Sequence, residues 1–399
     1  MSLPTLFLLN NSIKDYAWGD SRRLRQLFGI ENPHNVPQAE IWMGAHPADP
    51  SLVEWHGEQV RLDDLIATDP THFLGHMTAQ RFQERLPFLF KVLNAGQPLS
   101  IQLHPDKPTA ERGFADEQAR GVPLDSPTRN YADPNHKPEL ICALTPFRAL
   151  CGFRPVADIC EILALLDAPQ LTEFLPGLRG AHTEEALQAL CLGILQMPEP
   201  DLQAVLSHAL DVAAEHDRAD LNELCLLHEY YPGDRGVLFA LLLNRVELQP
   251  GEALFLGAGN MHSYLDGVGL EIMANSDNVI RGGLTPKHVD CDELVKLAHF
   301  VPLPEQQLRV SPVHEGAQTT YPTPVDDFAF ASIDVTGIGA TYPMDSCEIL
   351  LCVSGALTVH CAAQSLALEP GQSCFVCAAA GEFSVVGEGR LARAAVSIP

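Results

Sequence analysis

The pattern of apolar and polar positions changes twice along the chain. Up to about residue 150, short strand-like apolar runs are separated by proline and glycine, as in 87–93 and 99–103. From 155 to about 231 apolar residues recur at helical spacing, and from about 246 to Pro399 the strand pattern returns. The pattern predicts a mainly β chain with a helical insert. Helices are expected over 159–166, 184–195, 200–214 and 219–228, with short ones near 62–67 and 78–85.

One segment of the later strand-rich zone occurs twice. Residues 248–256 align with residues 368–376, and each copy has a Pro-Gly turn followed by an apolar strand. His262 follows the first copy, and Glu382 stands at the matching position after the second. Hairpins marked by glycine and joined by such turns are typical of small antiparallel jelly-roll barrels. We therefore expect two related cupin- or jelly-roll-like barrels plus an α-helical domain, with a metal-binding pattern in the first barrel alone.

The charge of the chain restricts its partners. With 51 Asp and Glu against 25 Lys and Arg, the formal net charge is −26, which argues against nucleic acid or an anionic membrane surface as a partner. No apolar stretch reaches the length of a membrane span, and the first residues lack the basic start of a secretory signal. A substrate that carries phosphate would need a local cluster of Lys and Arg to reverse the sign of the field.

The eleven cysteines are scattered through apolar surroundings. This is expected for the reduced, buried thiols of a cytosolic protein rather than for a disulfide framework. Cys374 and Cys377 form a Cys-x-x-Cys pair, but residues three apart on a strand point to opposite faces. We therefore expect these two side chains to pack in the core rather than to bind a metal.

Three stretches far apart in the sequence could together supply four metal ligands. Gln102 and His104 are two residues apart, so on a strand both side chains leave the same face. Glu139 could add a carboxylate and His262 a second imidazole, a mixed set that suits zinc and would also accept cobalt or manganese. Taken singly, each residue has an ordinary alternative role, such as a hydrogen-bonded strand edge, a solvated charge pair or a turn cap. If the four converge, the protein is expected to be a metalloenzyme.

Longer motifs extend this interpretation. Residues 16–19 read Tyr-Ala-Trp-Gly, residues 100–107 read Ser-Ile-Gln-Leu-His-Pro-Asp-Lys, and residues 269–287 form a long irregular run that ends in Arg-Gly-Gly-Leu-Thr-Pro-Lys. Together with 40–44 and 136–139, they make the chain resemble the type I phosphomannose isomerases over nearly its full length. The resemblance implies a zinc-dependent aldose–ketose isomerase that interconverts mannose 6-phosphate and fructose 6-phosphate through a cis-enediol. It also implies one zinc ion per chain and, with the acidic surface, favours a monomer in the cytoplasm.

The resemblance also assigns residues and domains. The metal ligands of the family correspond to Gln102, His104, Glu139 and His262, and its pocket arginine corresponds to Arg281. In the family, a helical domain interrupts a catalytic cupin domain, and a second cupin follows. We therefore expect a catalytic cupin domain of residues 1–154 with 246–310, a helical insert of 155–245, and a C-terminal cupin-like domain of 311–399 without a metal site.

Three residues are predicted to act in catalysis. Arg281 would stabilise the enediolate, because its planar guanidinium is always charged. The ordinary alternative is an ion pair with Asp277 or Glu271, and Asp277 would be its i, i+4 partner at helical spacing. Glu271 is the first choice for the general base, since burial can raise the pKa of a carboxyl group toward neutrality. Asp277 and Lys137, which follows His136, compete with it for that role.

Substrate contacts are expected nearby. Lys91 stands alone in an apolar strand run, where it must face a pocket, form an ion pair or extend to solvent. Tyr264 shares the strand face of His262 and would orient the sugar, or would be an aromatic at the barrel rim. Trp18 and Trp42 could line the sugar, although core packing is the more frequent role. The phosphate is expected to contact Lys287, Lys137 and Lys91. The predicted substrate-binding residues are Ser100, Lys91, Lys287, Tyr264 and Asp277.

Two other classes of function remain open at this point. A non-catalytic cupin that senses a sugar phosphate would be favoured by the loss of a metal ligand or of Arg281, and this chain retains all of them. A cupin oxygenase that uses iron would show a His-x-His pair, and Gln102-Leu103-His104 departs from that pattern.

Overall fold

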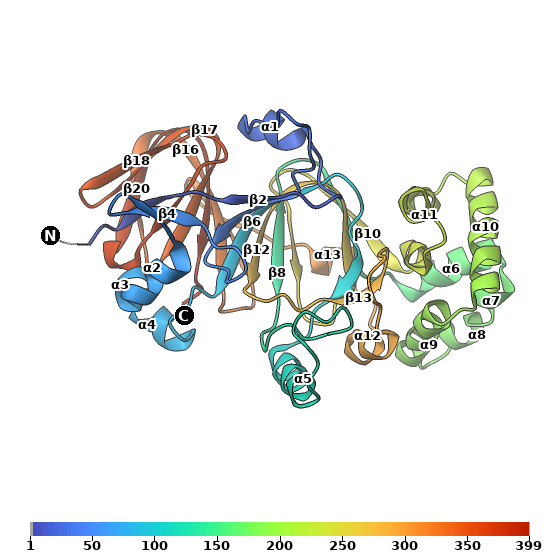
Figure 1. Ribbon diagram of the computed structural model, residues 1–399. Coiled ribbons are helices and arrows are strands. Elements are labelled where there is room, and N and C mark those ends of the chain that lie inside the picture. Colours follow the sequence, from blue (N-terminus) through green and yellow to red (C-terminus); the bar gives the residue numbers. More distant parts are fainter. Residues whose placement is uncertain (1–2, 399) are drawn as a thin grey trace.

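The computed structural model describes residues 3–398, and Figure 1 shows three parts in a row. A ten-stranded sheet occupies the middle, an eight-stranded sheet lies at one end, and a group of helices lies at the other. The fold class predicted from the hydrophobic pattern, mainly β with a helical insert, is confirmed. No helix among these residues is long and apolar enough to cross a membrane.

The strands of the ten-stranded sheet are β2 (Ser12–Lys14), β3 (Glu40–Gly44), β6 (Phe88–Ala95), β7 (Ile101–Leu103), β8 (Glu139–Ala143), β9 (Phe147–Phe153), β10 (Leu243–Leu248), β11 (Ala253–Leu256), β12 (His262–Ala274) and β13 (Ile280–Gly283). Strand β12 is its centre, because it pairs with β6 and β7 on one side and with β8 and β9 on the other. Both β6 and β12 are buried over nearly their whole length, which explains their continuous apolar runs. Buried charges in such strands, Lys91 and Glu271, need partners.

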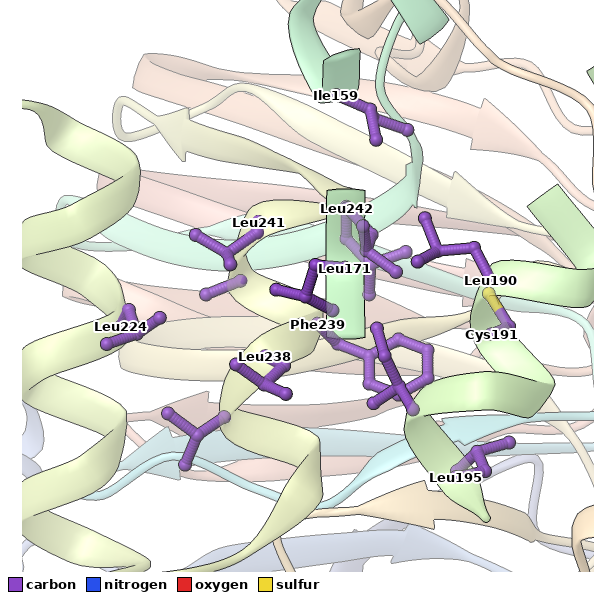
Figure 2. Packing of buried hydrophobic residues seen from close by; sticks show 14 of the residues in the cluster. Ile159, Leu171, Leu190, Cys191, Leu195, Leu224, Leu238, Phe239, Leu241 and Leu242 are labelled. Carbon is purple, nitrogen blue, oxygen red and sulfur yellow. The ribbon is translucent and has the colours of Figure 1, made fainter. Parts of the chain in front are cut away.

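The helical part consists of α6 (Val156–Leu166), α7 (Pro169–Thr172), α8 (Leu175–Leu178), α9 (Thr183–Leu195), α10 (Glu199–Glu215), α11 (Ala219–Tyr230) and the 3-10 helix η1 (Arg235–Leu241). The four longer helices, α6, α9, α10 and α11, match the four predicted from periodicity. Figure 2 shows the side chains of η1, including Phe239, between Leu190 of α9 and Leu224 of α11. The strand after the insert begins at Leu243, a few residues before the predicted return of strands at 246.

The remaining helices are α1 (Arg23–Phe28), α2 (Leu62–Thr68), α3 (Pro70–Leu74), α4 (His76–Arg81), α5 (Lys107–Ala119), α12 (Cys291–Leu297), α13 (Glu305–Leu308) and the 3-10 helix η2 (Ala378–Ala380). The short helix expected near 62–67 is α2, and that expected near 78–85 is α4, which ends at Arg81. Gln83 and Glu84 have φ angles of 54° and 63°, and this left-handed backbone cannot continue an α-helix.

The eight-stranded sheet contains β1 (Leu6–Leu9), β14 (Val313–Glu315), β15 (Gln318–Tyr321), β16 (Ala329–Pro343), β17 (Glu348–Cys361), β18 (Gln364–Leu368), β19 (Ser373–Val376) and β20 (Glu382–Ala395), while β4 (Leu52–Trp55) and β5 (Glu58–Arg61) form a separate hairpin. Over residues 3–398, the strand pairing of neither large sheet closes into a ring, so the predicted barrels are built from open sheets. Strand β1 pairs with β19, and this N-terminal segment therefore lies in the C-terminal sheet. The predicted catalytic domain included this segment, and that part of the prediction is corrected. The other predicted domain boundaries stay a proposal.

The predicted repeat has the same backbone in both copies. β10, a turn and β11 correspond to β18, a turn and β19, and Gly251 and Gly371 in the two turns have φ angles of 89° and 83°. Only glycine adopts such angles readily, which explains the repeated Pro-Gly. All eleven cysteines are free. Cys374 of β19 and Cys377, which directly follows this strand, are buried in different core clusters, and their side chains thus pack in the core on opposite sides, as predicted.

Candidate metal centre and substrate pocket

Three side chains from different strands meet in the ten-stranded sheet. His104 follows β7, Glu139 begins β8 and His262 begins β12, and their ligating atoms lie within 4.8 Å of one another. His104 Nε2 is 3.3 Å from Glu139 Oε1, and His262 Nε2 is 3.4 Å from Glu139 Oε2. With bonds of roughly 2.1 Å, the ligand atoms around a tetrahedral zinc ion are about 3.4 Å apart. The spacing therefore suits a single ion.

The atoms that face the centre of this triad are buried and have no hydrogen-bond partner among residues 3–398: His104 Nε2, Glu139 Oε2 and His262 Nε2. On the far side, each imidazole faces a backbone carbonyl: His104 Nδ1 donates to Asn278 O at 2.6 Å, and His262 Nδ1 donates to Asn260 O at 2.9 Å. Because Nδ1 must carry the proton to donate, Nε2 keeps its lone pair. The residues present thus fit a divalent metal ion.

Burial and charge hold the triad in the protonation state that binds metal. Burial lowers the pKa of His104 to about 4, although the Glu139 carboxylate opposes the shift. Burial alone would raise the pKa of Glu139. The positive charge of Lys137, whose Nζ lies 3.0 Å from Glu139 Oε1, and the contact with His104 outweigh burial and hold that pKa well below its usual range. Near neutral pH the centre therefore offers a neutral imidazole and an ionised carboxylate.

Gln102 and Arg281 extend the site in one row across the sheet. Gln102 on β7 lies opposite His262 on one side and opposite Arg281 of β13 on the other. Directly opposite residues share a face of the sheet, so the Gln102 amide is placed beside the triad and Arg281 beside Gln102. Arg281 is half-buried, burial lowers its pKa, and within residues 3–398 its guanidinium has no ion pair. The alternative of an i, i+4 ion pair with Asp277 is wrong, because Arg281 lies in a strand.

A second row of polar residues crosses β3, β6 and β12. Trp42 lies opposite Lys91, which lies opposite Glu271. Lys91 Nζ is 3.2 Å from Glu271 Oε2 and 3.5 Å from Glu40 Oε1. Burial would lower the pKa of Lys91, but these two carboxylates outweigh it and raise the pKa. Burial also raises the pKa of Glu271, and Lys91 offsets this in part. Lys91 therefore stays charged and holds Glu271 in place.

A cavity of about 1070 Å³ opens beside these rows, and its wall includes His46, His136 and Asp277. His136 Nε2 lies 2.9 Å from Asp327 Oδ2, and His46 Nε2 lies 3.6 Å from Asp277 Oδ2. His136 is three residues before Glu139 in the chain, but within residues 3–398 no residue of the triad lines the cavity. Its volume is sufficient for a small organic substrate.

Two family models match the chain. Residues 6–156 match the catalytic domain of type I phosphomannose isomerase, and residues 317–396 match the cupin domain of mannose-6-phosphate isomerase. Similar proteins include the mannose-6-phosphate isomerase of Shigella flexneri, which is 46% identical over 96% of this chain and 98% of its own. The human mannose-6-phosphate isomerase is 35% identical over 90% of this chain and 89% of its own.

The chain belongs to the type I phosphomannose isomerase family.

Solved structures of this family share the fold. A zinc-bound mannose 6-phosphate isomerase has a TM-score of 0.94 and 44% identity, and covers 99% of this chain and 100% of its own. A mutant phosphomannose isomerase from Salmonella typhimurium has the same TM-score, 43% identity and the same coverage.

The roles of the other predicted site residues stay predictions. Ser100 is half-buried directly before β7, and Lys287 is exposed four residues after β13. Asp277 is exposed at the cavity rim. Tyr264 is buried, its hydroxyl lacks a hydrogen-bond partner, and burial together with Glu271 raises its pKa well above the usual value.

Sequence reasoning missed several residues of the site. Glu40 shares a strand face with Trp42, and Trp42 Nε1 donates a hydrogen bond to Glu40 Oε2 at 2.6 Å. The alternation of side chains along residues 40–44 could have identified Glu40 as a residue of the site. The backbone carbonyls of Asn260 and Asn278 orient the imidazoles, and His46 lines the cavity. No sequence signal distinguishes these three contacts, because they depend on tertiary structure.

Proposed function

We propose that the protein interconverts D-mannose 6-phosphate and D-fructose 6-phosphate through a cis-enediol, with one zinc ion per chain. The observation that carries the proposal is the buried triad of His104, Glu139 and His262, with its unsatisfied ligating atoms facing one another. Membership of the type I phosphomannose isomerase family supplies the reaction, and the names of the relatives supply the substrate.

The metal would be held by the triad and by the amide oxygen of Gln102. A bound zinc ion would polarise the sugar carbonyl and neutralise charge that develops on its oxygen. A neutral amide as fourth ligand leaves Glu139 as the anionic one, so the centre keeps a net positive charge. The Asn260 and Asn278 carbonyls would fix the two imidazoles in their ligating orientation.

Proton transfer is assigned to Glu271. As carboxylate it would take the proton from C2 of the open-chain aldose while the C1 oxygen is protonated, which forms the cis-enediol. Return of the proton to C1 with loss of the O2 proton then gives the ketose. The raised pKa of Glu271 suits a base that must also give the proton back. Lys137 is the competing proton carrier, since its ammonium lies beside the triad.

Arg281 and Lys287 are assigned to the anionic parts of the substrate. A half-buried guanidinium without an ion pair has donors free for an enediolate oxygen, which supports the role of Arg281 as its stabiliser. Lys287 is exposed and close to Arg281 in the chain, which supports a phosphate contact together with Ser100. Lys91 is held between two carboxylates, and we therefore assign it to positioning Glu271 rather than to the phosphate.

A coupled assay tests the proposal. Conversion of mannose 6-phosphate to fructose 6-phosphate would be measured before chelation, after chelation and after zinc is restored, with His262→Ala and the exposed His314→Ala as matched variants. We expect turnover that chelation abolishes and zinc restores, that is absent in His262→Ala and normal in His314→Ala. Zinc-loaded wild type that binds the sugar phosphate without turnover would instead identify a sensor.

Two finer points complete the proposal. We propose a monomer, which size-exclusion chromatography with light scattering tests. We also propose the cytoplasm as the location, because eleven free thiols, most of them buried, suit a reducing compartment. Fractionation of cells that express the tagged protein tests this location.

A further inference from the structure

The helical insert returns to the ten-stranded sheet through one short segment, residues 231–236, which we call the return segment. The Asp234 carboxylate caps η1 by accepting from Gly236 N at 2.6 Å. The same carboxylate reaches the chain that leaves β13: Oδ1 accepts from Leu284 N at 2.9 Å, and Oδ2 accepts from Thr285 N at 3.2 Å. One side chain of the insert thus binds the backbone between Arg281 and Lys287.

The backbone that Asp234 binds has an unusual conformation. Gly283 has a φ angle of 146°, and Leu284, which is not glycine, has a φ angle of 53°. A leucine in this left-handed region is strained and persists only where its surroundings hold it. A Cβ atom on Gly283 would lie 2.5 Å from Gly236 Cα, so the two backbones touch directly. The carboxylate and this glycine–glycine contact together hold the strained turn.

A second hydrogen bond connects the return segment to the neighbouring strand. The Tyr231 hydroxyl donates to Pro98 O at 2.7 Å, and Pro98 lies just before Ser100 and β7. Strands β7 and β13 are paired, with Gln102 opposite Arg281. The return segment therefore contacts the loop that enters β7 and the loop that leaves β13.

The return segment itself is firmly supported. Its last two residues are the first two of η1, whose residues from Val237 to Leu241 are buried in the core of the helical part (Figure 2). The Arg235 guanidinium donates to the carbonyl of Leu195 at the end of α9. The Leu284 side chain is also buried in this core cluster.

We propose that Asp234 is a positioning residue, through which the helical insert sets the conformation of residues 281–287 and thereby aims Arg281 and Lys287 at the substrate. This inference rests on the proposed function, because it takes those two residues as substrate contacts. Asp234 acts through backbone N–H groups and does not touch the substrate. Removal of the carboxylate would leave the Leu284 N–H buried without an acceptor and release the strained turn.

The test compares Asp234→Ala and Asp234→Asn with Asp211→Ala, which changes an exposed aspartate on α10 of the same insert. Steady-state kinetics, zinc content, thermal unfolding and hydrogen exchange at the Leu284 and Thr285 amides would be measured on each. We expect Asp234→Ala to raise KM and lower kcat, with kcat/KM reduced about 10-fold to 100-fold, the scale of a misplaced catalytic group. Zinc content should not change, and the two amides should lose protection.

Asp234→Asn should give a partial effect, because its Oδ1 can still accept from Gly236 and Leu284 while the Thr285 bond is lost. Asp211→Ala should behave as wild type. The inference is overturned if the folded Asp234 variants keep wild-type kcat and KM, or keep the protection of both amides, even when their melting temperature falls. If wild type itself has no turnover, the proposed function fails. In that case the amide protection and the calorimetric affinity of each variant for mannose 6-phosphate still decide the role of Asp234.

Discussion

The two β-rich parts of the molecule share one plan but treat the same buried carboxylate differently. In the ten-stranded sheet, Glu139 of β8 lies opposite Leu256 of β11. In the eight-stranded sheet, Glu348 of β17 lies opposite Val376 of β19, at the matching end of the second repeat. Both carboxylates are buried, with 1% of each residue exposed. The strand register therefore equates Glu348 with the proposed metal ligand Glu139.

The charged residue on the strand that neighbours each carboxylate is different. Two residues after Glu139, Ile141 lies opposite Glu271, and two residues after Glu348, Leu350 lies opposite Arg393. Arg393 thus takes the place of Glu271, and its Nε donates to Glu348 Oε2 at 2.6 Å.

Two further positions also differ between the two sheets. Lys91, opposite Glu271, is replaced by Ala331, opposite Arg393. In the sequence repeat, Glu382 stands at the position that matches His262, and Glu382 is exposed.

The second sheet places an ion pair at the position where the first sheet has a candidate metal ligand. A buried carboxylate must be neutralised, and a guanidinium from the neighbouring strand does so where the first sheet has imidazoles that fit a metal ion. Burial raises the pKa of Glu348 despite Arg393, whereas Lys137 and His104 keep the pKa of Glu139 low. One fold thus supports either a cluster that fits a metal ion or a structural ion pair, depending on a few side chains.

The largest expected effect separates the two glutamates. Glu139→Gln should lower kcat/KM for mannose 6-phosphate by about 10³-fold or more, because a metal ion supplies several kcal/mol of charge stabilisation. Glu348→Gln should leave kcat/KM within about twofold, since it lies outside the site. Equal losses in the two variants, measured in the coupled assay, would contradict the division of roles.

The second prediction concerns stability. Arg393→Met leaves Glu348 buried without its cation and should lower the free energy of unfolding by about 3–5 kcal/mol, as measured by denaturant titration. Arg393→Met combined with Glu348→Leu should recover most of that loss, because no unpaired charge remains. If the double variant is as unstable as the single variant, Arg393 does not stabilise the fold through its ion pair with Glu348.

The third prediction uses pH to test the row of charges in the first sheet. Glu271 must be ionised to act as base, and burial raises its pKa, so kcat/KM should fall as the pH drops, at a higher pH than an exposed glutamate would cause. The Lys91 ammonium lowers that pKa. Lys91→Met should therefore move the acidic limb of the profile further toward neutral pH. If the acidic limb of the kcat/KM profile does not move in Lys91→Met, a group other than Glu271 is the general base.

The smallest effect is expected at the edge of the site. Lys287→Gln should raise KM for mannose 6-phosphate roughly tenfold with little change in kcat, because it removes one charge-assisted contact to the phosphate. Lys296→Gln, on nearby α12, serves as the control. A change in kcat without a change in KM would remove Lys287 from phosphate binding.

Much of this architecture could be predicted from the sequence, because periodicity is local. The four longer helices of the insert, the repeated Pro-Gly turns and the opposite faces of Cys374 and Cys377 all follow from spacing. The convergence of His104, Glu139 and His262 could be anticipated because each residue stands at a strand end. The family resemblance supplied the assignment of these residues to one metal site.

The rest depends on pairings that spacing does not encode. Nothing local indicates that β1 pairs with β19, or that Glu40 contacts Lys91 from the next strand. The helical spacing of Asp277 and Arg281 favoured an ion pair, but a strand begins between them. The contacts of Asp234 with Leu284 and Thr285 likewise arise from tertiary packing between the insert and the sheet.

The most direct test of the comparison is the number of zinc ions per chain. It would be determined by elemental analysis of purified wild type, His262→Ala and Glu382→Ala, which change the two equivalent positions. We predict one zinc ion in wild type and in Glu382→Ala, and none in His262→Ala. Two ions in wild type, or one ion that survives in His262→Ala and is lost in Glu382→Ala, would contradict the assignment of the metal centre to the first sheet.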